Sequence, residues 1–347
     1  MTGEEQIEEG LLLAGLDGAN PLAFLVALGT LRGLTIAWPL RRIRLSWKLQ
    51  DTWRPCLYMD DGVLDEEEVL DGLERFMEMR PGHEALEIGL NVKEHPTHLP
   101  PLPTGCGSCK TGPFDDLKVH PKWFRWVALS AADSALPEQR AQADFMAAFA
   151  NDAILNERGL NKGKFVDSTQ LQLCNGAGHQ HFLSRMRTLS DANAVGRDSL
   201  QDCLFSQWQR PDTRAWTMRW DPADDRRYAL RWDDPTPQGT EGVTEKGANR
   251  LAFEALPLFP VMPIGKMRVT TGFSERNRQT IWTWPIWDVP VGIDVTKSIL
   301  AIAEIQNQTL CPSAQNKLAC MGIKQVFRCR WIYGDQGRLS LSPASPV

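Results

Sequence analysis

The sequence predicts an α+β fold that combines antiparallel sheets with a mainly helical middle segment. Residues 42–49 alternate strictly between apolar and polar side chains, which is the period of a half-buried strand. The same alternation returns in the second half of the chain, most clearly in residues 216–232 and 324–332. Residues 116–210 carry mostly helical patterns. Because helical and strand patterns fall in separate blocks, the chain is typical of the α+β class.

The first expected element is a buried helix that begins after Asn20, a good N-cap, and places Pro21 in its first position. Gly29 lies inside this helix, where glycine costs up to about 1 kcal/mol relative to alanine, so it predicts close packing against another element. The apolar residues of the helix recur at three- and four-residue spacing: Phe24, Leu25, Leu28, Leu31 and Leu34.

Further N-terminal elements follow from pairing, capping and composition. Residues 53–58 are expected to pair with the strand at residues 42–49. Asp65 opens a capping box for a helix that runs to about Met79. Residues 81–113 are rich in Pro, Gly and His, which predicts an irregular loop or insertion.

The middle of the chain predicts four helices joined by irregular segments. A polar loop is expected at residues 151–163 and a short strand at residues 170–175. The helices are expected at residues 123–132, 138–150, 178–189 and 198–208.

Hairpins dominate the expected second half. Residues 216–220 and 227–232 predict a hairpin with an aromatic inner face and an arginine-bearing outer face. Residues 266–271 and 279–284 predict another, around the charged tip at residues 274–278.

Two helices and one strand complete the expected elements. A short helix is expected at residues 248–256, and Asp294 is expected to cap another that runs to about Gln306. The final strand, at residues 324–332, alternates between apolar and basic side chains.

These blocks suggest three segments that can pack as one domain. The first, residues 1–115, is α+β and contains the Pro/Cys/His-rich insertion. Residues 116–210 are mainly helical, and residues 211–347 form a hairpin-rich α+β segment. At 347 residues the chain is long enough to bury a sizeable core.

Composition limits the classes of function. The net charge of −5 gives no whole-chain electrostatic case for nucleic acid, although residues 265–338 hold ten bases and five acids. No apolar run reaches the roughly 18 residues of a membrane span, so no membrane partner is expected. The eight cysteines are scattered as in a reduced protein, and a cytoplasmic location is expected.

Three stretches resemble a family of antiviral proteins. They are NPLAFLVALGTLRGL (residues 20–34), RWDPADDRRYALRWDDP (residues 219–235) and GANRLAFEALPLFP (residues 247–260). They look like the helicase-nuclease-extension and large-subunit-like families of type I-G (formerly I-U) CRISPR systems. The resemblance implies a non-catalytic subunit or accessory protein of an RNA-guided effector complex. Its implied partners are crRNA, target DNA, other effector subunits or the helicase-nuclease.

Basic side chains on the expected strands are the main candidates for contacts with nucleic acid. Lys and Arg bind phosphate through charge and hydrogen bonds without reading sequence. Each basic face is also compatible with an ordinary solvated surface that nearby acids balance. The candidate residues are Arg42, Arg44, Lys48, Arg227, Arg231, Arg276, Arg278, Lys324, Arg328 and Arg330.

The insertion offers ligands for a structural zinc ion. His95, His98, Cys106 and Cys109 are the residue types that bind tetrahedral zinc. Only seven residues separate the two pairs, which is shorter than in common zinc modules. A surface insertion with incidental Cys and His is the alternative, and no other cofactor is expected.

Two other classes of function remain open. A metal-dependent nuclease or hydrolase could use His179 with Asp221 or Asp225, although the aspartates lie in a turn-rich connector beside arginines. A protein–protein adaptor without affinity for nucleic acid is the other alternative. The sequence lacks the phosphate-binding loop, the serine-hydrolase elbow and the dinucleotide fingerprint, so no catalytic residue is assigned.

Overall fold

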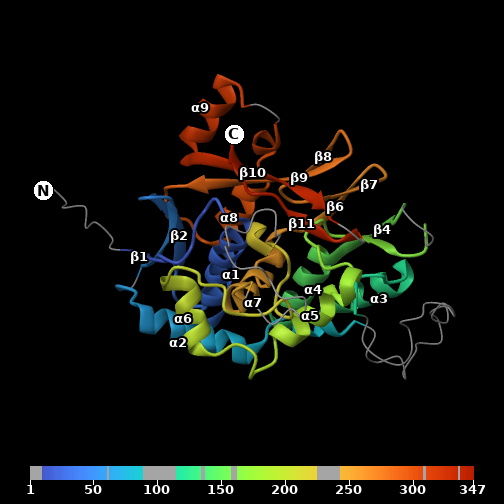
Figure 1. Cartoon of the computed structure of the whole chain (residues 1–347), viewed down its shortest axis with the longest axis horizontal. Coiled ribbons are helices and arrows are strands. Elements are labelled where there is room, and N and C mark those ends of the chain that lie inside the picture. Colours follow the sequence, from blue (N-terminus) through green and yellow to red (C-terminus); the bar gives the residue numbers. More distant parts are fainter. Residues whose placement is uncertain are drawn as a thin grey trace, which may run out of the picture.

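The computed structural model describes residues 10–60, 62–88, 115–133, 137–157, 162–224, 243–307, 310–334 and 337–347. The fold is α+β, as the sequence predicts, with helices and small antiparallel sheets. Figure 1 shows the C-terminal sheet above the central helices α1 and α7, with α2, α5 and α6 below them.

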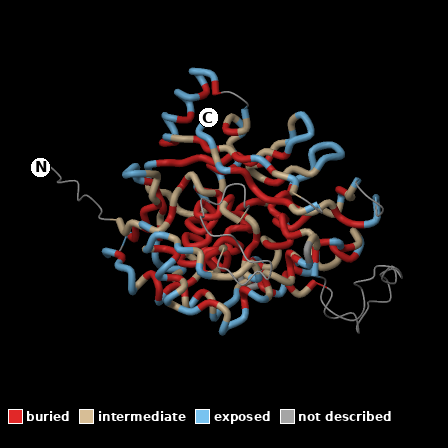
Figure 2. The backbone as a smooth tube through the Cα atoms, in the orientation of Figure 1, coloured by how far each residue is buried: buried red, intermediate tan, exposed pale blue. Residues whose placement is uncertain are grey.

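Helix α1 (Pro21–Ala37) is the centre of the core. Asn20 caps it by accepting hydrogen bonds from the amides of Leu22 and Ala23, as expected. The helix is buried on almost every side, which is typical of a helix enclosed by other elements. Figure 2 shows buried backbone concentrated around this position. Buried residues of all three expected segments belong to one hydrophobic cluster around it.

Close packing between α1 and α7 (Lys246–Phe253) confirms the prediction made from Gly29. A Cβ atom built on Gly29 would lie 1.9 Å from the carbonyl oxygen of Leu251 in α7. Only glycine permits this distance between the two backbones. At the same crossing Arg32, Arg250 and His83 all contact the buried carboxylate of Glu254.

Two antiparallel sheets pack on α1. The first has the order β1 (Leu11–Leu12), β3 (Trp53–Met59), β2 (Ile43–Leu49), so the expected pairing of residues 42–49 with 53–58 is confirmed. The second has the order β11 (Leu339–Leu341), β10 (Ile323–Tyr333), β9 (Gln279–Trp287), β8 (Phe273–Arg276), and β12 (Ser345–Pro346) also pairs with β10.

Buried tryptophans connect the two sheets to the N-terminal segment. The indole N–H of Trp284 donates to the Gly18 carbonyl at 2.9 Å, and that of Trp287 donates to the Leu45 carbonyl at 2.9 Å. Trp47 stacks on Phe24 of α1, with ring centroids 5.7 Å apart. The tryptophan-rich composition therefore serves the core at these positions.

The remaining elements surround this centre. Two further hairpins pair β4 (Ala150–Leu155) with β5 (Val166–Ser168), and β6 (Val261–Ile264) with β7 (Met267–Thr270). The other α-helices are α2 (Glu66–Met79), α3 (Pro121–Ala132), α4 (Pro137–Phe149), α5 (Phe182–Leu189), α6 (Arg197–Phe205), α8 (Ile293–Leu300) and α9 (Pro312–Cys320). Within the described ranges, no helix is both long enough and apolar enough to cross a bilayer.

Two predictions for the middle of the chain are wrong. The expected loop at 151–163 begins as strand β4, because its backbone pairs with β5. The expected strand at 170–175 is irregular. Thr270 of β7 accepts a hydrogen bond from the Gln170 amide at 3.0 Å, and the Gln170 side chain accepts one from the Thr270 amide at 2.8 Å. These long-range contacts replace the ladder that the apolar pattern suggested.

Both predicted hairpins of the second half need correction. Residues 216–220 form no strand, since the Met218 amide donates to the Asn249 side chain and the Trp220 indole donates to the Leu171 carbonyl. The second arm, residues 227–232, lies outside the described residues. Strand β7 pairs with β6, and β9 pairs with β8, so residues 266–271 do not pair with 279–284.

The predicted boundaries of two helices also change. Gly292, not Asp294, is the N-cap of α8, which ends at Leu300 before a separate 3-10 turn at Ala303–Gln306. The helix expected at 178–189 is a 3-10 turn at Ala177–His179 followed by α5.

Candidate functional site

Three predicted basic residues share the outer face of the C-terminal sheet. Directly opposite residues of an antiparallel pair project to the same face. Arg276 is opposite Gln279, while Arg330 and Arg328 are opposite Ile281 and Thr283 of the same strand. Gln279, Ile281 and Thr283 are alternate residues of β9, so they project from one face of the sheet. The three arginines opposite them project from the same face. The other side of β10 carries the buried residues Phe327, Cys329 and Trp331, as the alternation predicts.

Two of these arginines converge on neighbouring carbonyl groups. Arg276 donates to the Gln306 carbonyl, and Arg328 donates to the Asn307 carbonyl at 2.6 Å. Arg328 also donates from Nε to the Thr283 hydroxyl at 3.2 Å. Burial lowers the pKa of Arg328, and the charge of Arg276 lowers it further. The fold therefore holds two cations near each other, which favours an anion at this position.

A pocket of about 690 Å³ opens on this face, and we call it the basic pocket. Arg328 and Arg330 of β10 line it, together with Gln279 of β9 and Gln315 of α9. No Asp or Glu is among the described residues that line it. Guanidinium and amide donors without carboxylates can bind phosphate oxygens.

The structure places the other basic candidates elsewhere. Lys324 is near the start of β10 and forms an ion pair with Asp288 at 3.0 Å. Arg278 lies in the exposed turn between β8 and β9. Lys48 is exposed, with its Nζ atom 5.6 Å from the ring centroid of Tyr58. Arg227 and Arg231 lie outside the described residues.

Arg42 and Arg44 line a separate pocket of about 630 Å³ near the start of α8. Arg44 contacts Asp60 at 2.5 Å, and Arg42 lies 4.0 Å from the same carboxylate. Asp294 also lines this pocket. Nearby carboxylates therefore balance these arginines, in contrast to the lining of the basic pocket.

The structure does not assemble the catalytic alternative from its described members. Asp221 is buried, contacts Arg210 at 2.8 Å and accepts a hydrogen bond from Asn20 at 3.1 Å. These contacts join it to the N-cap of α1. His179 is exposed in a 3-10 turn, and no contact joins it to Asp221 in the described part of the chain. Asp225 lies outside that part.

The zinc prediction falls on residues that the structure does not describe. His95, His98, Cys106 and Cys109 all lie between residues 89 and 114, outside the described ranges. Among the described residues, no group of three or more His, Cys, Asp or Glu is arranged to hold a metal ion.

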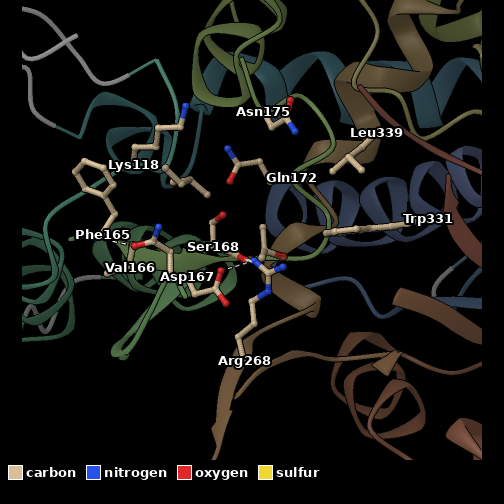
Figure 3. A pocket seen from close by; sticks show the side chains of 13 residues that line it. Lys118, Phe165, Val166, Asp167, Ser168, Gln172, Asn175, Arg268, Trp331 and Leu339 are labelled. Atoms are coloured by element: carbon tan, nitrogen blue, oxygen red, sulfur yellow. Dashed lines mark hydrogen bonds and ion pairs between the residues drawn. The ribbon is translucent and has the colours of Figure 1, made fainter. Parts of the chain in front are cut away.

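A second cavity combines residues that the sequence analysis did not select. This polar pocket has a volume of about 370 Å³ and lies where the β4–β5 hairpin, β7 and the inner face of β10 meet. Figure 3 shows Lys118, Gln172, Arg268 and Trp331 around it. These residues come from distant parts of the chain, so no local motif could have indicated them.

Comparisons with known proteins give no family assignment. No family model matches the chain, and a search of curated proteins finds no significant match.

Proposed function

We propose that this chain is a non-catalytic, cytoplasmic subunit or accessory protein of a type I-G CRISPR effector system. In this proposal the basic pocket binds the backbone of crRNA or target DNA. Other surfaces contact effector subunits or the helicase-nuclease. Sequence recognition is left to pairing between guide and target. The resemblance of three stretches supports the system, and the basic pocket supports the mode of binding.

The observation that carries the proposal is the grouping of Arg276, Arg328 and Arg330 on one sheet face. Two of them line a pocket whose described lining contains no Asp or Glu side chain. The pKa of Arg328 is lowered by burial and by the adjacent Arg276. A phosphate group bound there would relieve the repulsion between the two cations. Isolated surface arginines paired with acids, such as Arg44 with Asp60, lack this property.

Binding of nucleic acid by matched variants tests the proposal. The test variant carries Arg276→Gln, Arg328→Gln and Arg330→Gln. The control carries Arg54→Gln, Arg125→Gln and Arg140→Gln, which also removes three charges but at residues that contact Asp51, Asp152 and Asp144.

Fluorescence anisotropy with single-stranded RNA, single-stranded DNA and duplex DNA gives the affinity of each variant. We expect the test variant to bind at least about tenfold more weakly at low salt than the control, because phosphate contacts supply much of the affinity. Thermal unfolding followed by circular dichroism establishes that both variants fold. Equal affinity in the two variants would contradict a role for the basic pocket, and no binding by the wild type would favour an adaptor.

A further inference from the structure

The polar pocket contains a buried amide that has no partner in the described part of the protein. Gln172 is 8% exposed, and no hydrogen bond of its side chain is found among the described residues. Figure 3 shows its amide directed into the pocket. An amide that faces a cavity can donate and accept hydrogen bonds there. This amide therefore fits a ligand that presents both a donor and an acceptor.

The wall next to this amide is aromatic. Trp331 projects from the inner face of β10 and is 7% exposed. Figure 3 shows its ring edge-on, extending toward the space below Gln172 and Asn175. The guanidinium of Arg268 lies 5.9 Å from the centroid of this ring, so only part of the ring is open to the pocket, where it offers an apolar contact to a planar ligand. Strand β10 thus supplies Arg330 to the basic pocket on one face and Trp331 to the polar pocket on the other.

The charges around the pocket distinguish its floor from its rim. Arg268 contacts Asp167 at 2.8 Å, and the same guanidinium donates to the Ser168 carbonyl, so the floor is internally neutralised. Lys118 is exposed at the rim and forms no ion pair with any described residue. Lys118 is therefore a cation at the rim that a phosphate group can reach.

We propose that the polar pocket binds the base of one nucleotide. The base packs against the open part of the Trp331 ring and hydrogen-bonds through its edge to the Gln172 amide, and the phosphate lies toward Lys118. Amide side chains pair with base edges through adjacent donors and acceptors, and aromatic rings stack on base faces. The volume of about 370 Å³ lies within the range of small-molecule pockets. A free nucleotide and an unpaired nucleotide within a strand share this chemistry.

This site goes beyond the proposed function, since it uses different residues and recognises a base instead of a phosphate backbone. A sugar phosphate is the competing ligand, because it also offers hydroxyl groups and a charge. It lacks the planar ring that Trp331 would contact, so ribose 5-phosphate serves as the discriminating probe.

Calorimetric titration of the full chain with the four ribonucleoside monophosphates and ribose 5-phosphate tests the proposal. We expect at least one nucleotide to bind, and ribose 5-phosphate to bind at least about tenfold more weakly, since it has no base to contact Trp331 and to hydrogen-bond with Gln172. Equal binding of ribose 5-phosphate would overturn the proposal. It would also be overturned if no free nucleotide binds and no nucleotide within a short single-stranded RNA contacts the pocket.

Variants locate the bound nucleotide. Gln172→Met keeps the shape of the side chain but removes its hydrogen bonds, and we expect at least about fivefold weaker binding. Lys118→Met is expected to weaken binding of a nucleotide but not of the corresponding nucleoside. Gln201→Met and Lys122→Met are exposed controls outside the pocket lining and are expected to bind as the wild type does. Wild-type affinity in Gln172→Met would contradict the proposal.

Photo-crosslinking distinguishes the two sources of the nucleotide. A free 5-iodouridine monophosphate, or the same base within a short single-stranded RNA, is irradiated with the protein and the modified peptide is mapped. We expect the crosslink at Trp331 or Phe165. A crosslink with the free monophosphate identifies a free nucleotide as the ligand, and a crosslink only with the RNA identifies a nucleotide within a strand. The variant that lacks Arg276, Arg328 and Arg330 is expected to retain the crosslink with the free nucleotide. Loss of binding at the basic pocket is therefore distinguished from loss of binding at the polar pocket. A crosslink confined to other peptides would overturn the assignment.

Discussion

Glu254 shows how one residue can hold several buried charges together. Burial alone would raise its pKa, but His83, Arg250 and Arg32 outweigh burial and lower the pKa to about 2. Its ordinary value is 4.5, so the folded state favours the ionised carboxylate. The resulting stability is complete above pH 4.5 and is lost as the pH falls toward 2.

We expect Glu254→Gln to lower the free energy of unfolding by about 3–5 kcal/mol at pH 7, because it leaves Arg32 and Arg250 buried without their counter-charge. Urea unfolding measures the loss. Glu304→Gln removes an exposed partner of Lys317 and is the control, which should unfold at the wild-type urea concentration. A wild-type midpoint for Glu254→Gln would show that the network contributes no stability.

Asp224 has the opposite dependence on pH. Burial raises its pKa to about 7 from an ordinary 3.8, and the neighbouring Asp221 adds to this, while the Thr217 hydroxyl opposes it. Its Oδ1 atom is buried without a partner among the described residues. The folded state therefore favours the protonated acid, and the associated stability is full below pH 3.8 and is lost as the pH rises from there to about 7.

Asp224→Asn is expected to remove the loss of folding stability at higher pH, because the amide keeps an acceptor for Thr217 but carries no charge. The pKa difference corresponds to at most about 4 kcal/mol. Unfolding free energies at pH 5 and pH 8 should thus differ less in the variant than in the wild type. Asp191→Asn, at an exposed position, is the control. An unchanged pH dependence in Asp224→Asn would refute the assignment of this effect to Asp224.

At the scale of elements, the crossing of α1 and α7 depends on the absence of a side chain at Gly29. Gly29→Ala should lower the free energy of unfolding by about 1–3 kcal/mol, since the two backbones must separate to admit the methyl group. Chemical denaturation measures this change. Gly196→Ala is the control, because its Cβ would meet no atom within 4 Å. A more stable Gly29→Ala variant, as helix propensity alone predicts, would contradict the close crossing.

The elements that the sequence predicted well are those specified by local patterns. Helix α1 follows from its cap and apolar spacing, and β10 follows from alternation. Elements set by distant partners were predicted poorly. Residues 170–175 look like a strand, but Thr270 binds their backbone in an irregular conformation. Ser46 lies on the expected polar face of β2, yet it is buried and contacts the Tyr58 hydroxyl at 3.2 Å.

The same distinction applies to the candidate site. Alternation along β10 indicated that Arg328 and Arg330 share a face, but only the register with β9 and β8 adds Arg276 to them. The zinc ligands remain a prediction. The polar pocket could not be found from the sequence, because Gln172 and Trp331 lie 159 positions apart and line one cavity only through tertiary packing.

At the scale of the whole molecule, one strand connects the core to both pockets. The inner face of β10 packs Phe327 against Trp284, which is bonded to the segment before α1. The outer face carries the arginines of the basic pocket. Because the strand is fixed by α1 and the buried tryptophans, the arginines are held on a rigid scaffold instead of a loop. Such positioning reduces the entropy that is lost when a strand of nucleic acid binds.

The salt dependence of binding to single-stranded RNA tests the central claim most directly. The claim is that Arg276, Arg328 and Arg330 together contact phosphates. For single strands the slope of log K against log salt is about −0.7 for each phosphate neutralised. The slope of the triple variant should therefore be shallower than that of the wild type by about 2, while the control variant keeps the wild-type slope. Equal slopes in the wild type and the triple variant would show that these arginines do not contact phosphate.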